Sequence, residues 1–134
     1  MVHTTVVGSY PRIGDTRDEQ KLRRAIARHD RGEISEADLR DVEREVVRDV
    51  IREQVEAGID IVTDGQISWY DSQSHIARGF EGVEIDGLVR YFNTNTYYRQ
   101  PVVRAGVAWR RPILTDEWAY ARSVSRKPVK AVLT

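Results

Sequence analysis

The feature that most constrains the fold is a long amphipathic segment that stops at a glycine and leads directly into a short apolar segment. Apolar residues recur at helical spacing and predict a helix over about residues 36–57. Ser35 and Asp38 form a capping-box pattern at its start, and Gly58 is a typical C-terminal stop. Residues 59–63 then predict a short buried strand. A helix, a glycine and a buried strand make one half of a βαβ unit, so we expect a parallel sheet.

The rest of the chain continues this alternation of strands and helices. The expected elements, each marked by periodicity or by capping and turn residues, are strands over residues 4–8, 88–92, 102–108 and 127–134, helices over residues 15–31 and 115–125, and a helix or irregular loop over residues 68–80. The order of the two middle strands stays open. The β-α-β-(α)-β-α-β alternation predicts the α/β class with a parallel sheet.

Composition narrows the possible classes of function. The chain has 134 residues, with 21 basic and 21 acidic side chains and a formal net charge of zero. This balance argues against a dedicated nucleic-acid-binding protein, which normally carries a basic excess. The absence of cysteine excludes disulfides within the chain, and with three histidines it excludes the usual Cys/His zinc site. Because no apolar run approaches ~20 residues and no secretory signal is visible, we expect a soluble cytoplasmic protein with no membrane partner.

Glycine and polar residues follow the first two predicted strands. Gly8 and Ser9 come after the first, and Asp64 and Gln66 come after the second. Parallel α/β folds bind ligands beyond the carboxyl ends of their strands, where a glycine admits close approach and a serine holds a carboxylate. Ordinary turns account for the same residue types, since Asp-Gly pairs are common in turns. Residue types alone favour a turn at Gly8 and leave both interpretations open at Asp64.

Other motifs carry little chemistry. Neither GxGxxG nor GxxxxGK[ST] is present, so dinucleotide and P-loop functions have no support. The aromatic and amide cluster around Tyr91 and Tyr98 is compatible with stacking a flat ligand, but a half-buried strand with a polar turn is the favoured interpretation. His75 is expected at the surface and not in a metal site.

Six stretches together resemble the catalytic barrel of cobalamin-independent methionine synthase. In chain order they are TTVVGSYPR (4–12), GEIS (32–35), EAGIDIVTDGQISWYD (56–71), YYRQPVV (97–103), TDEWAYARS (115–123) and KPVKAVLT (127–134). They occur in the family's order and with its spacing, and they cover nearly the whole chain. The resemblance implies a partial (β/α)8 TIM barrel of about the first four βα units, with residues 1–134 forming its N-terminal half.

The resemblance also implies an activity and its cofactors. The complete family enzyme transfers a methyl group to the zinc-bound thiolate of homocysteine and forms methionine. Its donor is a methylfolate, or a methylated corrinoid protein in shorter relatives. The family's zinc ligands come from later strands, so we expect no catalytic or metal-ligating residue here and a complementary half-barrel as a possible partner. Two alternatives stay open: another member of the superfamily, such as a uroporphyrinogen decarboxylase-like enzyme or a different thiol methyltransferase, and a non-catalytic truncated half-barrel.

Five residues match the family's substrate-binding positions or lie beside them. Gly8 and Ser9 match the Gly-Ser that holds the amino-acid part of homocysteine or methionine. Gln66 stands where the family usually has a glutamate that holds the substrate amine, and a neutral amide forms hydrogen bonds of about half the strength of charge-assisted ones. Asp64 is then an alternative source of negative charge. Asp71 matches an acidic residue of the same family segment.

Overall fold

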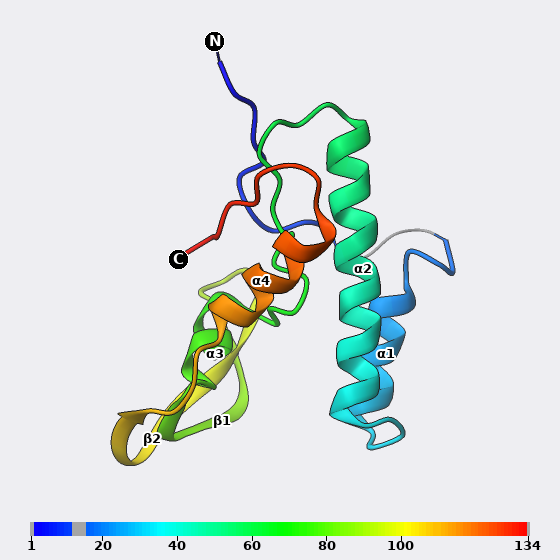
Figure 1. Ribbon diagram of the computed structural model, residues 1–134. Coiled ribbons are helices and arrows are strands. Elements are labelled where there is room, and N and C mark those ends of the chain that lie inside the picture. The colour runs from blue at the N-terminus through cyan, green and yellow to red at the C-terminus, as the bar shows by residue number, and fades with distance from the viewer. Residues whose placement is uncertain (1, 12–15, 134) are drawn as a thin grey trace. The chain divides into compact units, whose positions relative to one another are not determined.

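The computed structural model describes residues 2–11 and 16–133, which divide into two compact units. The first unit comprises Met1–Ser68 and Glu117–Leu133, and the second comprises Trp69–Asp116. The elements in chain order are α1 (Lys21–Asp30), α2 (Glu36–Glu56), α3 (Ser72–Ala77), β1 (Phe80–Arg90), β2 (Tyr97–Trp109) and α4 (Leu114–Val124), as labelled in Figure 1.

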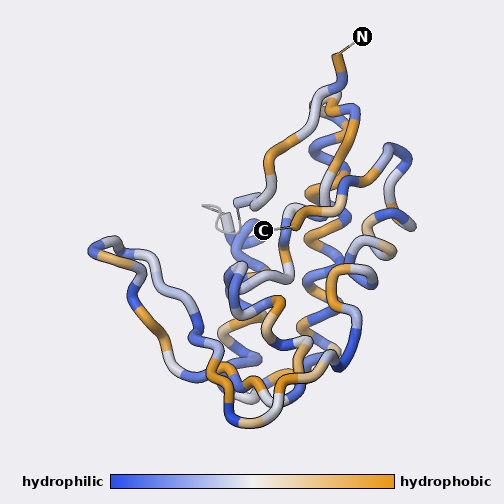
Figure 2. The backbone as a smooth tube through the Cα atoms, turned by 90° about the vertical axis from the view of Figure 1, so that its left-hand side faces the viewer, coloured by the Kyte–Doolittle hydropathy of each residue, from blue (hydrophilic) through white to orange (hydrophobic). Residues whose placement is uncertain are grey.

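Helix α2 begins as its sequence predicts. Ser35 Oγ accepts a hydrogen bond from the Asp38 N–H at 3.1 Å, and the Asp38 carboxylate accepts one from the Ser35 N–H at 2.9 Å. These two bonds complete a capping box. Hydrophobic and hydrophilic residues alternate along the helical turns (Figure 2), and Leu39, Val47 and Ile51 are among the buried residues of α2. The prediction of a helix over residues 36–57 is therefore confirmed to within one residue.

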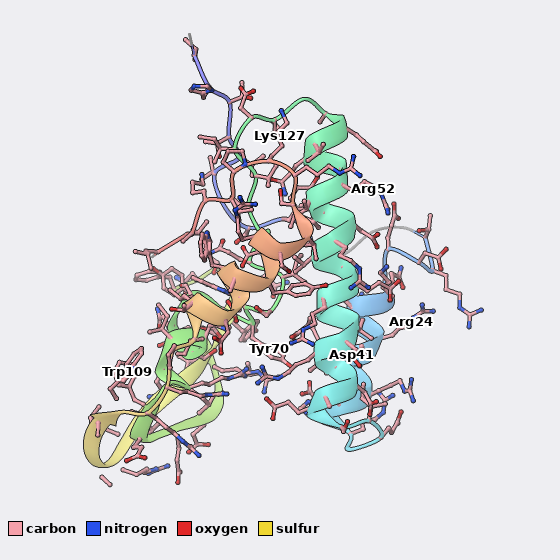
Figure 3. The ribbon with its side chains drawn as sticks, in the orientation of Figure 1. Arg24, Asp41, Arg52, Tyr70, Trp109 and Lys127 are labelled. Atoms are coloured by element: carbon pink, nitrogen blue, oxygen red, sulfur yellow. The ribbon has the colours of Figure 1, made fainter. Side chains whose placement is uncertain are left out.

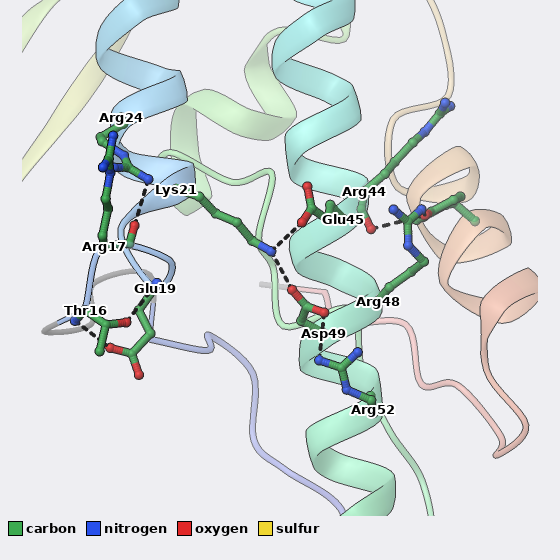
Figure 4. A network of polar contacts seen from close by, with 11 residues as sticks. Thr16, Arg17, Glu19, Lys21, Arg24, Arg44, Glu45, Arg48, Asp49 and Arg52 are labelled. Carbon is green, nitrogen blue, oxygen red and sulfur yellow. Dashed lines mark hydrogen bonds and ion pairs between the residues drawn. The ribbon is translucent and has the colours of Figure 1, made fainter.

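Helix α1 lies alongside α2 and is shorter than predicted (Figure 1). Residues 16–20 form a bend and turns before the helix, because Thr16 and Glu19 satisfy each other's backbone N–H groups at 2.8 and 3.2 Å. Residue 15, the predicted start, lies outside the described residues. Figure 4 shows Lys21 Nζ donating to Glu45 at 2.8 Å and to Asp49 at 2.6 Å, which ties α1 to α2.

The predicted parallel pairing is present in the first unit, but only as isolated bridges. Thr5 pairs with Ile61 and Val62 pairs with Val129, both in parallel. Backbone hydrogen bonds of 2.9–3.1 Å join these segments. The second predicted strand therefore lies between the first and the last, and the carboxyl ends of all three point the same way. The predicted strands over residues 4–8, 59–63 and 127–134 therefore have the expected place and direction, but each forms only an isolated bridge and not a strand of the predicted length.

The predicted strands over residues 88–92 and 102–108 are confirmed for residues 88–90 and 102–108, but β1 begins at Phe80 and β2 at Tyr97, and the assignment to a parallel sheet is wrong. In the second unit, β1 and β2 form an antiparallel hairpin, with Val83 opposite Val103 and Arg90 opposite Tyr97. The physical reason is the connection of residues 91–96, because a parallel pair needs a crossover of a dozen or more residues. Trp109, labelled in Figure 3, ends β2 and is 62% exposed. Its ring meets the ring of Phe80 edge-on.

The core of the first unit gathers apolar side chains from segments that are distant in sequence. Its buried members are Leu22, Val47, Val50, Ile51, Val62, Ile67 and Ala121. They come from α1, α2, the central bridged segment with the turn that follows it, and α4. Among residues 2–11 and 16–133, no helix is long and apolar enough to cross a membrane.

Candidate functional site

The two predicted loops meet in the first unit through a hydrogen bond between side chains. Ser9 Oγ donates to Gln66 Oε1 at 2.9 Å. A Cβ atom on Gly8 would lie 2.9 Å from the same oxygen, so the absence of a side chain at Gly8 leaves room for the amide. Ser9 is exposed, whereas Gln66 is 5% exposed. The Gln66 amide is therefore buried beneath an exposed Ser9 and a half-buried Gly8.

The turn that carries Gln66 has an unusual backbone. Gly65 and Gln66 have φ angles of 71° and 53°, so two consecutive residues adopt the left-handed conformation. Asp64 Oδ1 accepts a hydrogen bond from the Gln66 N–H at 2.9 Å, and Thr63 Oγ1 accepts one from the Gly65 N–H at 3.1 Å. Asp64 thus closes a turn, and its side chain is half-buried. Left-handed conformations of residues other than glycine are costly and cluster at functional sites.

Tyr10 joins the two loops and was not identified from the sequence. Its N–H donates to the Gly65 carbonyl at 2.9 Å, and a Cβ on Gly65 would lie 2.8 Å from the Tyr10 Cβ. Burial, and then a hydrogen bond with Glu53, raise the pKa of Tyr10 to about 12. The signal that could have found Tyr10 is its place directly after the Gly-Ser pair.

Gln54 is a second residue beside the candidate site that sequence reasoning missed. It lies on the buried face of α2 at 2% exposure, and its amide exchanges two hydrogen bonds of 3.0 Å with the backbone of Thr63. A polar side chain in line with Val47, Val50 and Ile51 on one helical face was the available signal.

Asp71 belongs to the second unit and contacts residues of that unit. Its carboxylate accepts hydrogen bonds from the Gln73 N–H, the Ser74 N–H and Oγ, and the Arg99 N–H, at 2.7–3.0 Å. Burial alone raises the pKa of Asp71, but these hydrogen bonds outweigh it and hold the pKa below its ordinary value. The carboxylate caps α3 and ties it to β2. The structure therefore brings Gly8, Ser9, Asp64 and Gln66 together within one unit, and it shows Asp71 in a structural network.

The described residues do not form a metal centre. Within residues 2–11 and 16–133, no group of three His, Cys, Asp or Glu side chains is placed to hold a metal ion. The sequence also contains no cysteine. The zinc implied by the resemblance therefore does not fit the described residues.

The fold and the strand-end site define a mixed α/β protein, and solved structures share this fold. A B12-independent methionine synthase from a Shewanella species, solved in complex with selenomethionine, matches with a TM-score of 0.70 and 19% identity, over 97% of this chain and 37% of that one. A vitamin-B12-independent methionine synthase from Listeria monocytogenes matches with a TM-score of 0.63 and 16% identity, over 92% of this chain and 34% of that one. At these identities the match is one of fold.

Sequence comparison identifies the family. The family described as the catalytic domain of cobalamin-independent synthase matches residues 2–134. Methionine synthases of Saccharolobus solfataricus and Sulfurisphaera tokodaii are 35% and 38% identical over 93% and 91% of this chain. A 5-methyltetrahydropteroyltriglutamate–homocysteine methyltransferase of Thermotoga petrophila is 34% identical over 98% of it. The chain belongs to the cobalamin-independent synthase catalytic domain family, as its motifs predicted. It spans 36%, 34% and 17% of the length of these three relatives.

Proposed function

We propose that this chain supplies the part of a methyltransferase that holds the amino-acid portion of homocysteine and of its product, methionine. The observation that carries the proposal is the hydrogen bond between Ser9 and Gln66, which joins the carboxyl ends of two neighbouring parallel segments. Ligands of parallel α/β folds bind at such ends. Family membership supplies the reaction, which is transfer of a methyl group to the sulfur of homocysteine.

The architecture we propose is the start of a (β/α)8 barrel. The three parallel segments are assigned to its opening βα units, in chain order. In the sequence, the β1–β2 hairpin comes after the second of these segments and before the third. The sequence predicted about four units. The proposed donor is methyltetrahydropteroyltriglutamate, which appears in the name of the Thermotoga relative. A methylated corrinoid protein as donor, and a complementary half-barrel as partner, are the alternatives.

Each residue of the site has a proposed role. Gly8 leaves the room in which the Gln66 amide lies. The Ser9 N–H holds the ligand carboxylate, and the Ser9 hydroxyl joins it when its hydrogen turns from Gln66 to the carboxylate. The Gln66 amide contacts the amine end, and the half-buried Asp64 supplies the negative charge that an ammonium group needs. Asp71 contributes by fixing α3 against β2.

Methionine affinity in a Ser9→Ala variant tests the proposal. Loss of one hydrogen bond to the ligand is expected to weaken binding by roughly 3- to 10-fold, measured by titration calorimetry on the full protein. Ser72→Ala, an exposed serine of the second unit, is the matched control and should bind as the original protein does. A protein that binds no methionine contradicts the proposed function, and unchanged affinity in Ser9→Ala removes Ser9 from the site.

Gln66 favours a second candidate, a methyltransferase acting on a different thiol. The side chain at this position is a neutral amide, and its oxygen already accepts a hydrogen bond from Ser9. Methionine and 4-(methylthio)butanoate, which lacks the α-amino group, distinguish the candidates. Clearly tighter binding of methionine supports homocysteine as the acceptor, whereas equal affinities support the second candidate.

A further inference from the structure

We propose that Gln54 of α2 is a positioning residue for the amino-acid site. It sets the place of the turn that carries Asp64 and Gln66 without touching the ligand itself. The inference rests on the proposed function, because the site it serves is the one assigned there.

The Gln54 side-chain amide bonds the backbone of Thr63 in the way that the backbone of a neighbouring strand would. Its Oε1 accepts a hydrogen bond from the Thr63 N–H at 3.0 Å, and its Nε2 donates to the Thr63 carbonyl at 3.0 Å. Nε2 also donates to the Val50 carbonyl within α2 at 3.1 Å, which orients the amide. Gln54 and Thr63 are 2% and 0% exposed. A buried side chain therefore bonds both backbone polar groups of Thr63.

This bonding occurs where the parallel pairing ends. Val62 forms the last bridge, and Thr63 is the next residue. Its buried N–H and C=O groups need partners, because an unpaired buried polar group is costly. The Gln54 amide supplies them, and it does so from a helix whose own position is set by the core.

The left-handed turn follows directly from this anchored residue. Gln66, which lacks the conformational freedom of Gly65, holds its positive φ angle only if the surrounding structure determines it. Helix α2 also stands behind the turn, since a Cβ on Gly65 would lie 3.0 Å from Val50 Cγ1. The geometry therefore transmits the position of α2 to the turn of Gln66 through the Gln54 amide, with Val50 packed behind Gly65.

A pair of variants separates positioning from simple stability. Gln54→Met keeps the length of the side chain and removes both hydrogen bonds to Thr63. Val47→Ala is the control, since it also weakens the buried face of α2, about two turns earlier, in the same core. Both variants and the original protein are compared by thermal unfolding and by amide hydrogen exchange of Gly65 and Gln66. Methionine binding is measured by calorimetry at a temperature well below the thermal unfolding midpoint of each protein.

We expect Gln54→Met to weaken methionine binding by about 10-fold or more and to speed exchange at Gly65 and Gln66, while Val47→Ala changes affinity less than about 2-fold. If the original protein binds methionine and the two variants lose affinity equally at matched stability, the inference is overturned. If the original protein binds no methionine, the proposed function and the link of Gln54 to it both fail, and the exchange data decide only whether Gln54 holds the turn in place. Unchanged exchange at the turn in Gln54→Met then overturns that role, and faster exchange confined to the turn supports it.

Discussion

At the scale of single residues, the candidate site depends on two glycines, Gly8 and Gly65, whose lack of a side chain lets neighbouring groups approach closely. Gly8 has no side chain, and the space this leaves is occupied by the Gln66 amide oxygen. Gly65 similarly admits Tyr10 and Val50 at distances that a Cβ would forbid. The two loops are held together by such close approaches, by Ser9 and by the backbone of Tyr10.

The hydroxyl of Tyr10 predicts a dependence of stability on alkaline pH. Its pKa is raised from 10.0 to about 12 by burial and by Glu53, so folding favours the protonated form. A group with a raised folded-state pKa contributes stability that is fully present below the unfolded pKa and is lost as pH rises through the folded value. The free energy of unfolding should therefore fall between about pH 10 and pH 12.

The Tyr10→Phe variant should show a shallower fall over the same interval, measured by urea unfolding at a series of pH values. Tyr97→Phe, at a 50% exposed position in β2, serves as the control and should follow the original protein. Identical pH profiles for Tyr10→Phe and the original protein would contradict a protected hydroxyl at Tyr10.

At the scale of elements, α2 is the frame on which the site is built. Its start is defined by local side chains, its middle packs into the core, and its last two turns carry Val50, Glu53 and Gln54. These three residues contact the turn of Gly65, the hydroxyl of Tyr10 and the backbone of Thr63. A change in the position of α2 is therefore a change in both loops.

The capping box of α2 predicts a measurable loss in Ser35→Ala. The substitution leaves the Asp38 N–H without the serine oxygen, and removal of such a cap costs about 1 kcal/mol, within a range of about 0.5–2. Urea unfolding followed by far-ultraviolet circular dichroism measures the difference. Ser123→Ala, an exposed serine whose hydroxyl donates to the Tyr120 carbonyl within α4, should change the free energy of unfolding by less than about 0.5 kcal/mol. Equal losses in both variants would argue against a special role for the cap.

At the scale of the whole molecule, the first unit is assembled from both ends of the chain. Helix α4 brings Tyr120 to α2, where its hydroxyl donates to the Arg44 carbonyl at 3.1 Å and accepts from Arg48 at 2.7 Å. Beyond α4, the chain returns to pair Val129 with Val62. The first unit therefore depends on contacts between residues far apart in sequence, such as the 57 positions that separate Ser9 from Gln66 and the 67 that separate Val62 from Val129.

Leu22 predicts the cost of disturbing this shared core. It is 1% exposed and packs in the cluster that α1, α2 and α4 share, so Leu22→Ala should lower the free energy of unfolding by about 2–5 kcal/mol. Leu88→Ala, at a 66% exposed position of β1, should cost about 0.5 kcal/mol or less. Urea unfolding of both variants measures the difference, and similar values for the two would contradict the core described here.

Features that depend on neighbouring residues could be predicted from the sequence, whereas features that depend on contacts between distant residues could not. The Gly8–Ser9 and Asp64–Gln66 pairs were identified as candidates because strand ends and turn residues are local signals. Their meeting through one hydrogen bond, and the contributions of Tyr10 and Gln54, required knowledge of which segments lie side by side. The second unit shows the same limit, since Asp71 matched a family segment, but its bonding to Arg99 depends on how β2 passes α3.

By itself, the sequence determined the helix after Ser35, the strand propensity on either side of residues 91–96, and the family motifs, because capping, periodicity and turn chemistry act over a few residues. Only the tertiary structure decided that β1 and β2 pair with each other in an antiparallel hairpin, and that the segment of Val62 lies between those of Thr5 and Val129. Pairing depends on long-range packing and on the length of each connection, and a strand pattern is the same whichever neighbour it meets.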